Sequence, residues 1–320
     1  MPYNRFAFFV LLVLALLCGL GCDRSDQRNE AIDRLLVVTS FFPLYDFARV
    51  LGGDDFDVVC LTPPGGDPHS MDVSPRMAKT VADAQLVILL GFGLDSWVKK
   101  LCDSEFQEHV SIASLGLTPR KVEATALSEF SLSTKGHDQS KTVPEIADVD
   151  PHVWLDPILA QHIVERIADE LISIGPQHRE SVLERRRAFL GQLEELHNEF
   201  ETKLKNVTRR EVVTFHGAFA YLFTRYQLDT VGVVEHFPGD EPSAMYLRQL
   251  VDLMRTLGMR VIFAEPQLPD RPAQVIAWEI GGRVERLDPC ETILPNAPHA
   301  TYLERQRANI ETLGRVLKEP

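Results

Sequence analysis

The chain has 320 residues, of which 45% are hydrophobic and 25% charged, a composition that supports packed globular cores and, at this length, more than one domain. Its 46 acidic residues outnumber its 33 basic ones, which gives a formal net charge of −13 at pH 7. This excess of negative charge argues against nucleic acid as a partner and suits a cation as the ligand.

The first 21 residues have the layout of a secretory signal. A single basic residue, Arg5, precedes an apolar core at residues 6–17, and small residues follow it. The apolar core is shorter than the roughly 20 residues that a membrane span needs. Residues 1–21 are therefore predicted to be a signal peptide, with an uncleaved membrane anchor as the alternative.

Cys22 ends a Gly-Leu-Gly-Cys sequence that resembles the lipobox of bacterial lipoproteins. The resemblance implies that Cys22 carries a lipid and becomes the first mature residue, attached to the membrane on its periplasmic or extracytoplasmic side. Gly19 stands where the motif commonly has leucine, so ordinary cleavage nearby is the alternative. Residues 22–34 are polar and lack a packing pattern, and they are predicted to form a flexible tether.

Cysteine use argues against a disulfide scaffold. After Cys22 the chain has only Cys60, Cys102 and Cys290, an odd number with no CxxC pair. At most one disulfide bond can form among them, and ligation of zinc by thiolates lacks its usual paired spacing. Free or buried thiols are the expected state.

The segment that follows the tether alternates strands and helices. Strands are predicted from apolar runs at residues 35–41, 56–61 and 86–90. An amphipathic stretch separates the first two, and a second helix is predicted at residues 75–82 with Ser74 as its N-cap. This order is typical of β-α-β units and predicts a parallel sheet. Residues 123–150 have low hydrophobicity and predict an exposed loop.

Two helical patterns follow, at residues 157–173 and 177–206. In the second, apolar residues recur at steps of three, four and seven between charged positions: Val182, Phe189, Leu193, Leu196, Phe200 and Leu204. A single helix of about 28 residues would be roughly 40 Å long, enough to join two lobes as a stiff strut. The alternative is a surface helix packed within one domain.

After residue 206 the alternation restarts. Strands are predicted at residues 211–215, 230–234, 260–264 and 283–287. Helices are predicted at residues 218–226 and 242–257, from residue 272 onward, and at residues 299–317. Because this order repeats the plan of the first half, the predicted fold is α/β, with two parallel-sheet lobes at residues 35–176 and 207–320.

Three histidines far apart in the chain are the candidates for a metal site. His69 and His152 each end an Asp-Pro-His tripeptide, and His216 directly follows a predicted strand, as Asp288 follows another. Ligands of open α/β sheets bind beyond the carboxyl ends of the strands, so two facing lobes would bring these side chains together. Each histidine taken singly is more typical of a core or surface residue.

Six blocks of sequence, in order and over essentially the whole mature chain, resemble the metal-binding receptors of bacterial ABC importers. The blocks are VVTSFFPLYDFARVLGG, LTPPGGDPHSMDVSP, DPHVWLDP, VVTFHGAFAYLFTRY, FAEPQ and RLDP. The resemblance implies two α/β lobes joined by one long rigid helix, with the metal in the cleft between them. It also implies an ABC permease and its ATPase as partners of a monomeric receptor that is not an enzyme.

Carried over by position, His69, His152 and His216 match the family's metal-binding histidines. Asp288 matches the acidic position that completes the site in many members. Three neutral imidazoles and one carboxylate form a four-ligand set suited to Zn²⁺. Glu265, in FAEPQ, matches an acidic residue near the site and is expected to orient an imidazole.

The third histidine decides the expected metal. Manganese receptors of this family commonly have a carboxylate there, which suits Mn²⁺ better than imidazole does, so His216 favours zinc. A manganese or iron receptor is the alternative, because many zinc receptors carry a His-rich loop and residues 123–150 hold only His137. His236 follows a strand beside acidic residues and is a candidate for contacting the metal or gating the cleft.

Three rival functions come from other classes. A secreted zinc hydrolase would also use histidine ligands, but the chain has no HExxH motif and its histidines are dispersed. A receptor for an iron chelate would be expected to show Arg, Tyr or aromatic residues at its site. A surface adhesin is the third, and no feature of the sequence argues for adhesion. Capture and delivery of Zn²⁺ is therefore the predicted function.

Overall fold

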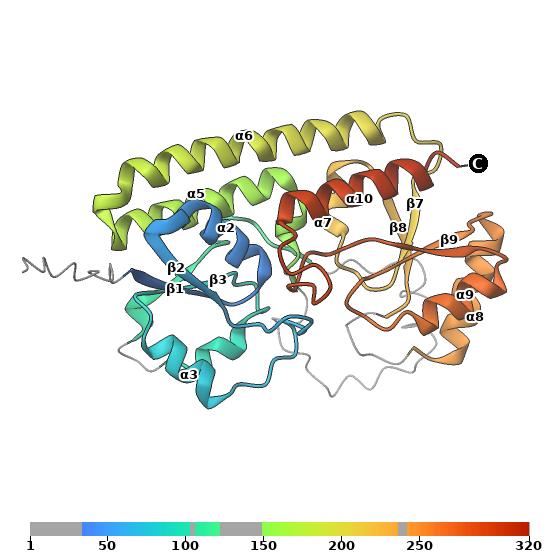
Figure 1. Cartoon of the computed structure of the whole chain (residues 1–320). Coiled ribbons are helices and arrows are strands. Elements are labelled where there is room, and N and C mark those ends of the chain that lie inside the picture. The colour runs from blue at the N-terminus through green and yellow to red at the C-terminus, as the bar shows by residue number, and fades with distance from the viewer. Residues whose placement is uncertain (1–33, 103–105, 122–148, 236–241, 320) are drawn as a thin grey trace, which may run out of the picture. The chain divides into compact units, whose positions relative to one another are not determined.

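A computed structural model of the chain describes residues 34–102, 106–121, 149–235 and 242–319 (Figure 1). Residues 35–320 form one compact unit, within which the elements below are placed. The predicted signal peptide, Cys22, most of the tether, His137 and His236 lie outside the described residues. In the parts of the chain that are described, no helix combines the length and the hydropathy that a membrane span requires.

The first half contains a four-stranded parallel sheet with strand order β2-β1-β3-β4. Its strands are β1 (Leu35–Thr39), β2 (Phe56–Cys60), β3 (Leu86–Leu89) and β4 (Val110–Ile112). Its helices are α2 (Phe42–Gly52), α3 (Pro75–Ala82) and α5 (Pro157–Ile174), with 3-10 turns at Gly53–Asp55, Ser96–Lys100, Phe106–His109 and Val153–Leu155. The three predicted strands are confirmed, whereas β4, with only three residues, is too short to show a pattern in the sequence.

The second half repeats this plan with strand order β10-β9-β7-β8, again all parallel. Its strands are β7 (Glu211–Thr214), β8 (Asp229–Val233), β9 (Val261–Ala264) and β10 (Arg283–Arg286). Its helices are α7 (Ala220–Arg225), α8 (Ala244–Thr256), α9 (Arg271–Glu279) and α10 (Tyr302–Val316). In both sheets the first strand lies between the second and the third, so the predicted repetition of one β-α-β plan is confirmed.

The first half also contains a short antiparallel ribbon, and one long helix connects the two halves. The ribbon pairs β5 (Arg120–Lys121) with β6 (Val149–Asp150). After a 3-10 turn at Pro176–His178, α6 runs from Arg179 to Leu204 and packs against α2, α5 and α10 (Figure 1). The long helix that the apolar spacing predicts is therefore present, and it contacts elements from both halves.

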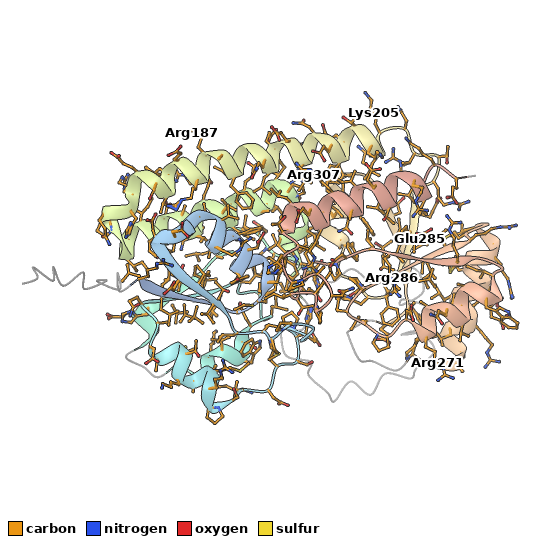
Figure 2. The ribbon with its side chains drawn as sticks, in the orientation of Figure 1. Arg187, Lys205, Arg271, Glu285, Arg286 and Arg307 are labelled. Atoms are coloured by element: carbon orange, nitrogen blue, oxygen red, sulfur yellow. The ribbon has the colours of Figure 1, made fainter. Side chains whose placement is uncertain are left out.

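The buried face of α6 carries the apolar residues that recur in the sequence. Val182, Phe189, Leu193, Leu196, Phe200 and Leu204 are all buried there. Arg307 of α10 is labelled in Figure 2. Its Nε lies 3.1 Å from both carboxylate oxygens of Glu199 on α6. Because exposed ion pairs contribute little, the buried apolar face holds α6 in place.

An aromatic cluster connects α2, α6 and α10. The Phe47 ring lies edge-on to Phe189, with centroids 5.5 Å apart, and edge-on to Tyr302, with centroids 4.9 Å apart. Tyr302 also donates its hydroxyl to the Trp154 carbonyl at 2.6 Å and its backbone N–H to Asp46 at 2.9 Å. The second half is thus anchored to the first through packed rings and buried hydrogen bonds.

Replacing Phe189 with alanine tests this packing. We expect Phe189→Ala to lower the free energy of unfolding by about 3–5 kcal/mol, because it leaves a cavity between three helices. Glu195→Ala, on the exposed face of the same helix, is the control and should change it by less than about 0.5 kcal/mol. Chemical denaturation followed by circular dichroism measures both, and equal losses would contradict the assignment of the buried face.

Candidate metal centre

The three predicted histidines meet at one place, together with a glutamate. His69, His152, His216 and Glu291 each offer one ligand atom, and these atoms all lie within 4.8 Å of one another. His152, His216 and Glu291 are buried, whereas the His69 side chain is 21% exposed. The cluster draws His69 and His152 from the first half of the chain and the other two from the second.

The first two histidines are held by the aspartate of their own Asp-Pro-His tripeptide. The Asp67 carboxylate accepts the backbone N–H of His69 at 2.8 Å, and Asp150 accepts that of His152 at 2.9 Å. This is the Asx turn, in which a side chain takes a backbone donor two residues on. Trp97 adds a second restraint to the turn before His69 by donating its indole N–H to the Pro68 carbonyl at 3.0 Å.

His152 and His216 are each oriented by a carboxylate at Nδ1. Asp150 Oδ1 lies 2.7 Å from His152 Nδ1, and Glu265 Oε1 is hydrogen-bonded to His216 Nδ1. Glu265 can reach His216 because they follow β9 and β7, which are parallel neighbours in the sheet. Such partners leave Nε2 of each ring free to face a metal. The structure thus places Glu265 where the sequence leads us to expect it.

The fourth group is Glu291, which is not among the residues predicted from the sequence. Its Oε1 lies 3.0 Å from His152 Nε2, 3.4 Å from His69 Nε2 and 3.6 Å from His216 Nε2. One carboxylate oxygen therefore faces all three imidazoles. Three imidazole nitrogens and one carboxylate oxygen form a donor set that fits Zn²⁺.

Asp288 is not part of this cluster, which corrects the expected fourth ligand. Both of its oxygens pair with the buried Arg305, with Oδ1–Nη2 and Oδ2–Nε distances of 2.6 Å. Oδ1 also accepts the Cys290 backbone N–H at 2.8 Å. Asp288 therefore holds the loop in the same way as Asp67 and Asp150, and the carboxylate beside the imidazoles belongs to Glu291.

A repeated Asp-Pro dipeptide is the signal that could have located Glu291. Asp-Pro precedes His69, His152 and the Cys290-Glu291 pair, and in all three places the aspartate accepts a backbone N–H two residues on. At Cys290 the backbone has a positive φ of 57°, so the chain turns once more before Glu291. The sequence does not show this extra turn.

The buried charges of the cluster stabilise one another. Burial disfavours the charged form of His152, but hydrogen bonds with Asp150 and Glu291 outweigh it and raise its pKa. Burial acts likewise on His216, and the charge of Glu265 raises its pKa well above the usual value. Burial would raise the pKa of Glu291, yet hydrogen bonds with the imidazoles hold it well below its usual range. The site therefore favours positive charge, carried by protons or by a metal ion.

Apolar side chains close one side of the site. Trp154 is fully buried, its ring centroid lies 5.1 Å from that of His152, and it packs edge-on against Phe41 at 4.7 Å. Its indole N–H donates to the Pro289 carbonyl at 2.8 Å. Trp154 therefore excludes water beside His152 and contacts the loop that carries Glu291.

Residues 37–316 match the model of a protein family described as zinc-uptake complex component A, periplasmic. The chain belongs to this family. The zinc uptake protein ZnuA of Bacillus subtilis is 26% identical over 97% of each chain. The laminin-binding protein Lmb of Streptococcus agalactiae, a bifunctional adhesin and metal transporter, superposes with a TM-score of 0.76 at 31% identity, over 89% of this chain and 100% of its own.

A zinc-bound structure of a ZnuA deletion mutant has the same fold, with a TM-score of 0.72 and 27% identity over 90% of this chain and 100% of that one. The family consists of metal receptors and not of enzymes, which confirms the predicted class. Zinc as the expected ligand agrees with the family and with the donor set of the cluster.

Glu265→Gln tests the orientation of His216. Because glutamine keeps the shape but removes the charge at His216 Nδ1, we expect zinc affinity to fall about 10-fold or more. Glu279→Gln on the exposed end of α9 is the matched control and should leave affinity unchanged. Competition with a chromophoric chelator measures both variants, and an unchanged affinity for Glu265→Gln would refute the role assigned to this carboxylate.

Proposed function

We propose that this protein captures Zn²⁺ outside the inner membrane and delivers it to an ABC permease and its ATPase. His69, His152, His216 and Glu291 hold the ion. The observation that carries the proposal is the convergence of these four side chains, three of them buried, on one point. The family description, a component of a zinc-uptake complex, supports the delivery step.

The donor set favours zinc over manganese and iron. Imidazole nitrogen is a borderline donor that suits Zn²⁺, whereas Mn²⁺ is better served by oxygen ligands. Three of the four groups in the cluster are imidazoles, and His216 is the one for which a carboxylate would favour manganese. A receptor for Mn²⁺ or Fe²⁺ is the alternative within the same family.

Four protein ligands also suit a carried ion better than a catalytic one. A catalytic zinc site has three protein ligands and leaves a position for water. Glu291 adds a fourth ligand in this chain, and a fully protein-bound ion does not activate water.

The receptor acts outside the inner membrane, to which a lipid attaches it. Residues 1–21 serve as a signal peptide, and Cys22 carries the lipid that attaches a monomeric receptor to the membrane through the tether at residues 22–34. Their composition supports this arrangement. The description of the family as periplasmic supports the same location.

Metal titration of the purified protein tests the ligand set. We expect one zinc ion per chain, with Zn²⁺ displacing Mn²⁺. His216→Ala and Glu291→Gln should each lower zinc affinity by more than about 100-fold, beyond the usual effect of residues that only orient a ligand. Bound metal is measured by mass spectrometry and affinity by chelator competition.

Asp288→Asn is the control that separates the two candidate acids. It breaks a buried ion pair, so it should lower the free energy of unfolding while zinc binding is retained. If Asp288→Asn abolishes binding and Glu291→Gln does not, or if Mn²⁺ displaces Zn²⁺, the assignment fails.

Acid should weaken zinc binding. The pKa values of His152 and His216 are raised, so each ring keeps its second proton to a higher pH than a free imidazole does, and zinc must displace that proton. As the pH falls through these raised values, affinity should drop by about tenfold per pH unit for each proton displaced. Titrations between pH 8 and pH 5 and calorimetry in buffers of different ionisation enthalpy measure the effect. An affinity independent of pH would contradict it.

A further inference from the structure

One amide connects the two glutamates of the metal centre. Gln267, in the loop after β9, donates from Nε2 to Glu265 Oε2 at 2.9 Å and to Glu291 Oε2 at 3.4 Å. An amide nitrogen has two N–H groups, so it can serve both carboxylates at once. The Oε1 of Gln267 is buried with no partner among the described residues, so the contacts of this side chain with the site come from its donor end.

The two oxygens of Glu291 have different partners, because Gln267 is hydrogen-bonded to only one of them. Oε1 faces the three imidazoles at 3.0 to 3.6 Å, while Oε2 faces the amide. Glu265 shows the same division, since its Oε1 is hydrogen-bonded to His216 Nδ1 and its Oε2 accepts from Gln267. The amide thus restrains both carboxylates so that one oxygen of each points toward the histidines.

We propose that Gln267 is a specificity-determining residue that keeps Glu291 a ligand through one oxygen only. This inference rests on the proposed function, in which Glu291 and the three histidines hold the ion. With one oxygen the protein supplies four ligands, the number that Zn²⁺ prefers. With both oxygens Glu291 would supply a fifth ligand and a second hard oxygen, a change toward the oxygen-rich, higher-coordinate sites that suit Mn²⁺.

A cavity beside Gln267 and Glu291 gives the Glu291 carboxylate room to bind through both oxygens. A cavity of about 20 Å³ is lined by Gly65, Gly66, Asp67, Gln267, Leu268 and Glu291. Removing the amide would leave Oε2 of Glu291 without this donor, beside a cavity into which it can turn. The carboxylate could then rotate about its last side-chain bond, because Gln267 is the hydrogen-bond partner of that oxygen among the described residues.

The test replaces Gln267 with leucine, which removes the donor at similar volume. Gln274→Leu is the matched control, since Gln274 also donates from Nε2 to a carboxylate, that of Asp270 at 2.9 Å, on an exposed part of α9. Zinc and manganese affinities are measured by competition. Co²⁺ is then bound as a probe, because its visible absorption is much stronger in four-coordinate sites than in five- or six-coordinate ones.

For Gln267→Leu we expect the ratio of zinc to manganese affinity to fall about 10-fold or more, within the range known for residues that support metal ligands. The visible absorption of the Co²⁺ complex should weaken, and the Gln274→Leu protein should match the wild type in both respects. An unchanged Co²⁺ spectrum overturns the inference, whether the affinities stay the same or fall together. Should Gln267→Leu fail to fold by circular dichroism, Gln267→Asn, too short to reach both carboxylates, is judged by the same two readouts.

The wild-type protein separates this inference from the function on which it rests. If the wild type does not bind Zn²⁺, the proposed function fails. If the wild type binds Zn²⁺ tightly and the Gln267 variants keep both its metal preference and its Co²⁺ spectrum, only the role of Gln267 fails.

Discussion

One carboxylate oxygen of Glu291, buried among three imidazoles, determines how the metal centre is built. An isolated carboxylate is costly to bury, so Glu291 requires compensation by positive charge or by several donors. The imidazoles supply the donors, and two of them are themselves supported by Asp150 and Glu265. A divalent cation at the same point satisfies all of these groups together, which explains why carboxylates gather where apolar residues would otherwise be expected.

The loop that carries Glu291 shows how the fold meets this constraint. Arg305 of α10 pairs with Asp288 at the start of the loop and donates to the Thr292 carbonyl at its end, at 2.8 Å. The guanidinium also stacks over the Phe42 ring, 4.5 Å from its centroid. One buried arginine therefore fixes both ends of a short loop. Because Glu291 lies between these ends, it loses little conformational entropy when a metal ion binds.

Much of the fold could be predicted because its signals are local. Apolar runs predict the two parallel sheets, and the spacing along α6 predicts a long one-sided helix. The Asp-Pro-His tripeptides indicate two histidines of the cluster, each held by its own aspartate. The place of Asp288 could not be predicted, because its partner, Arg305, lies 17 residues away on another element. The same holds for Gln267, since it is hydrogen-bonded to a carboxylate 24 residues away. Pairings of this kind depend on tertiary structure, which a single sequence does not reveal.

The four ligand groups differ in how firmly they are held, and this bears on how a receptor can both bind and release an ion. His152, His216 and Glu291 have side chains that are 7%, 2% and 4% exposed, whereas His69 is 21% exposed. The loop before His69 contacts the second half through two hydrogen bonds, from Gly65 N–H to the Ile293 carbonyl at 2.9 Å and from the Thr292 hydroxyl to the Pro63 carbonyl at 3.3 Å. Separating this loop breaks fewer buried contacts than moving α6, whose whole apolar face is packed against both halves. His69 is therefore the member of the cluster that solvent reaches most readily, and its loop is held to the second half by fewer contacts than α6 is.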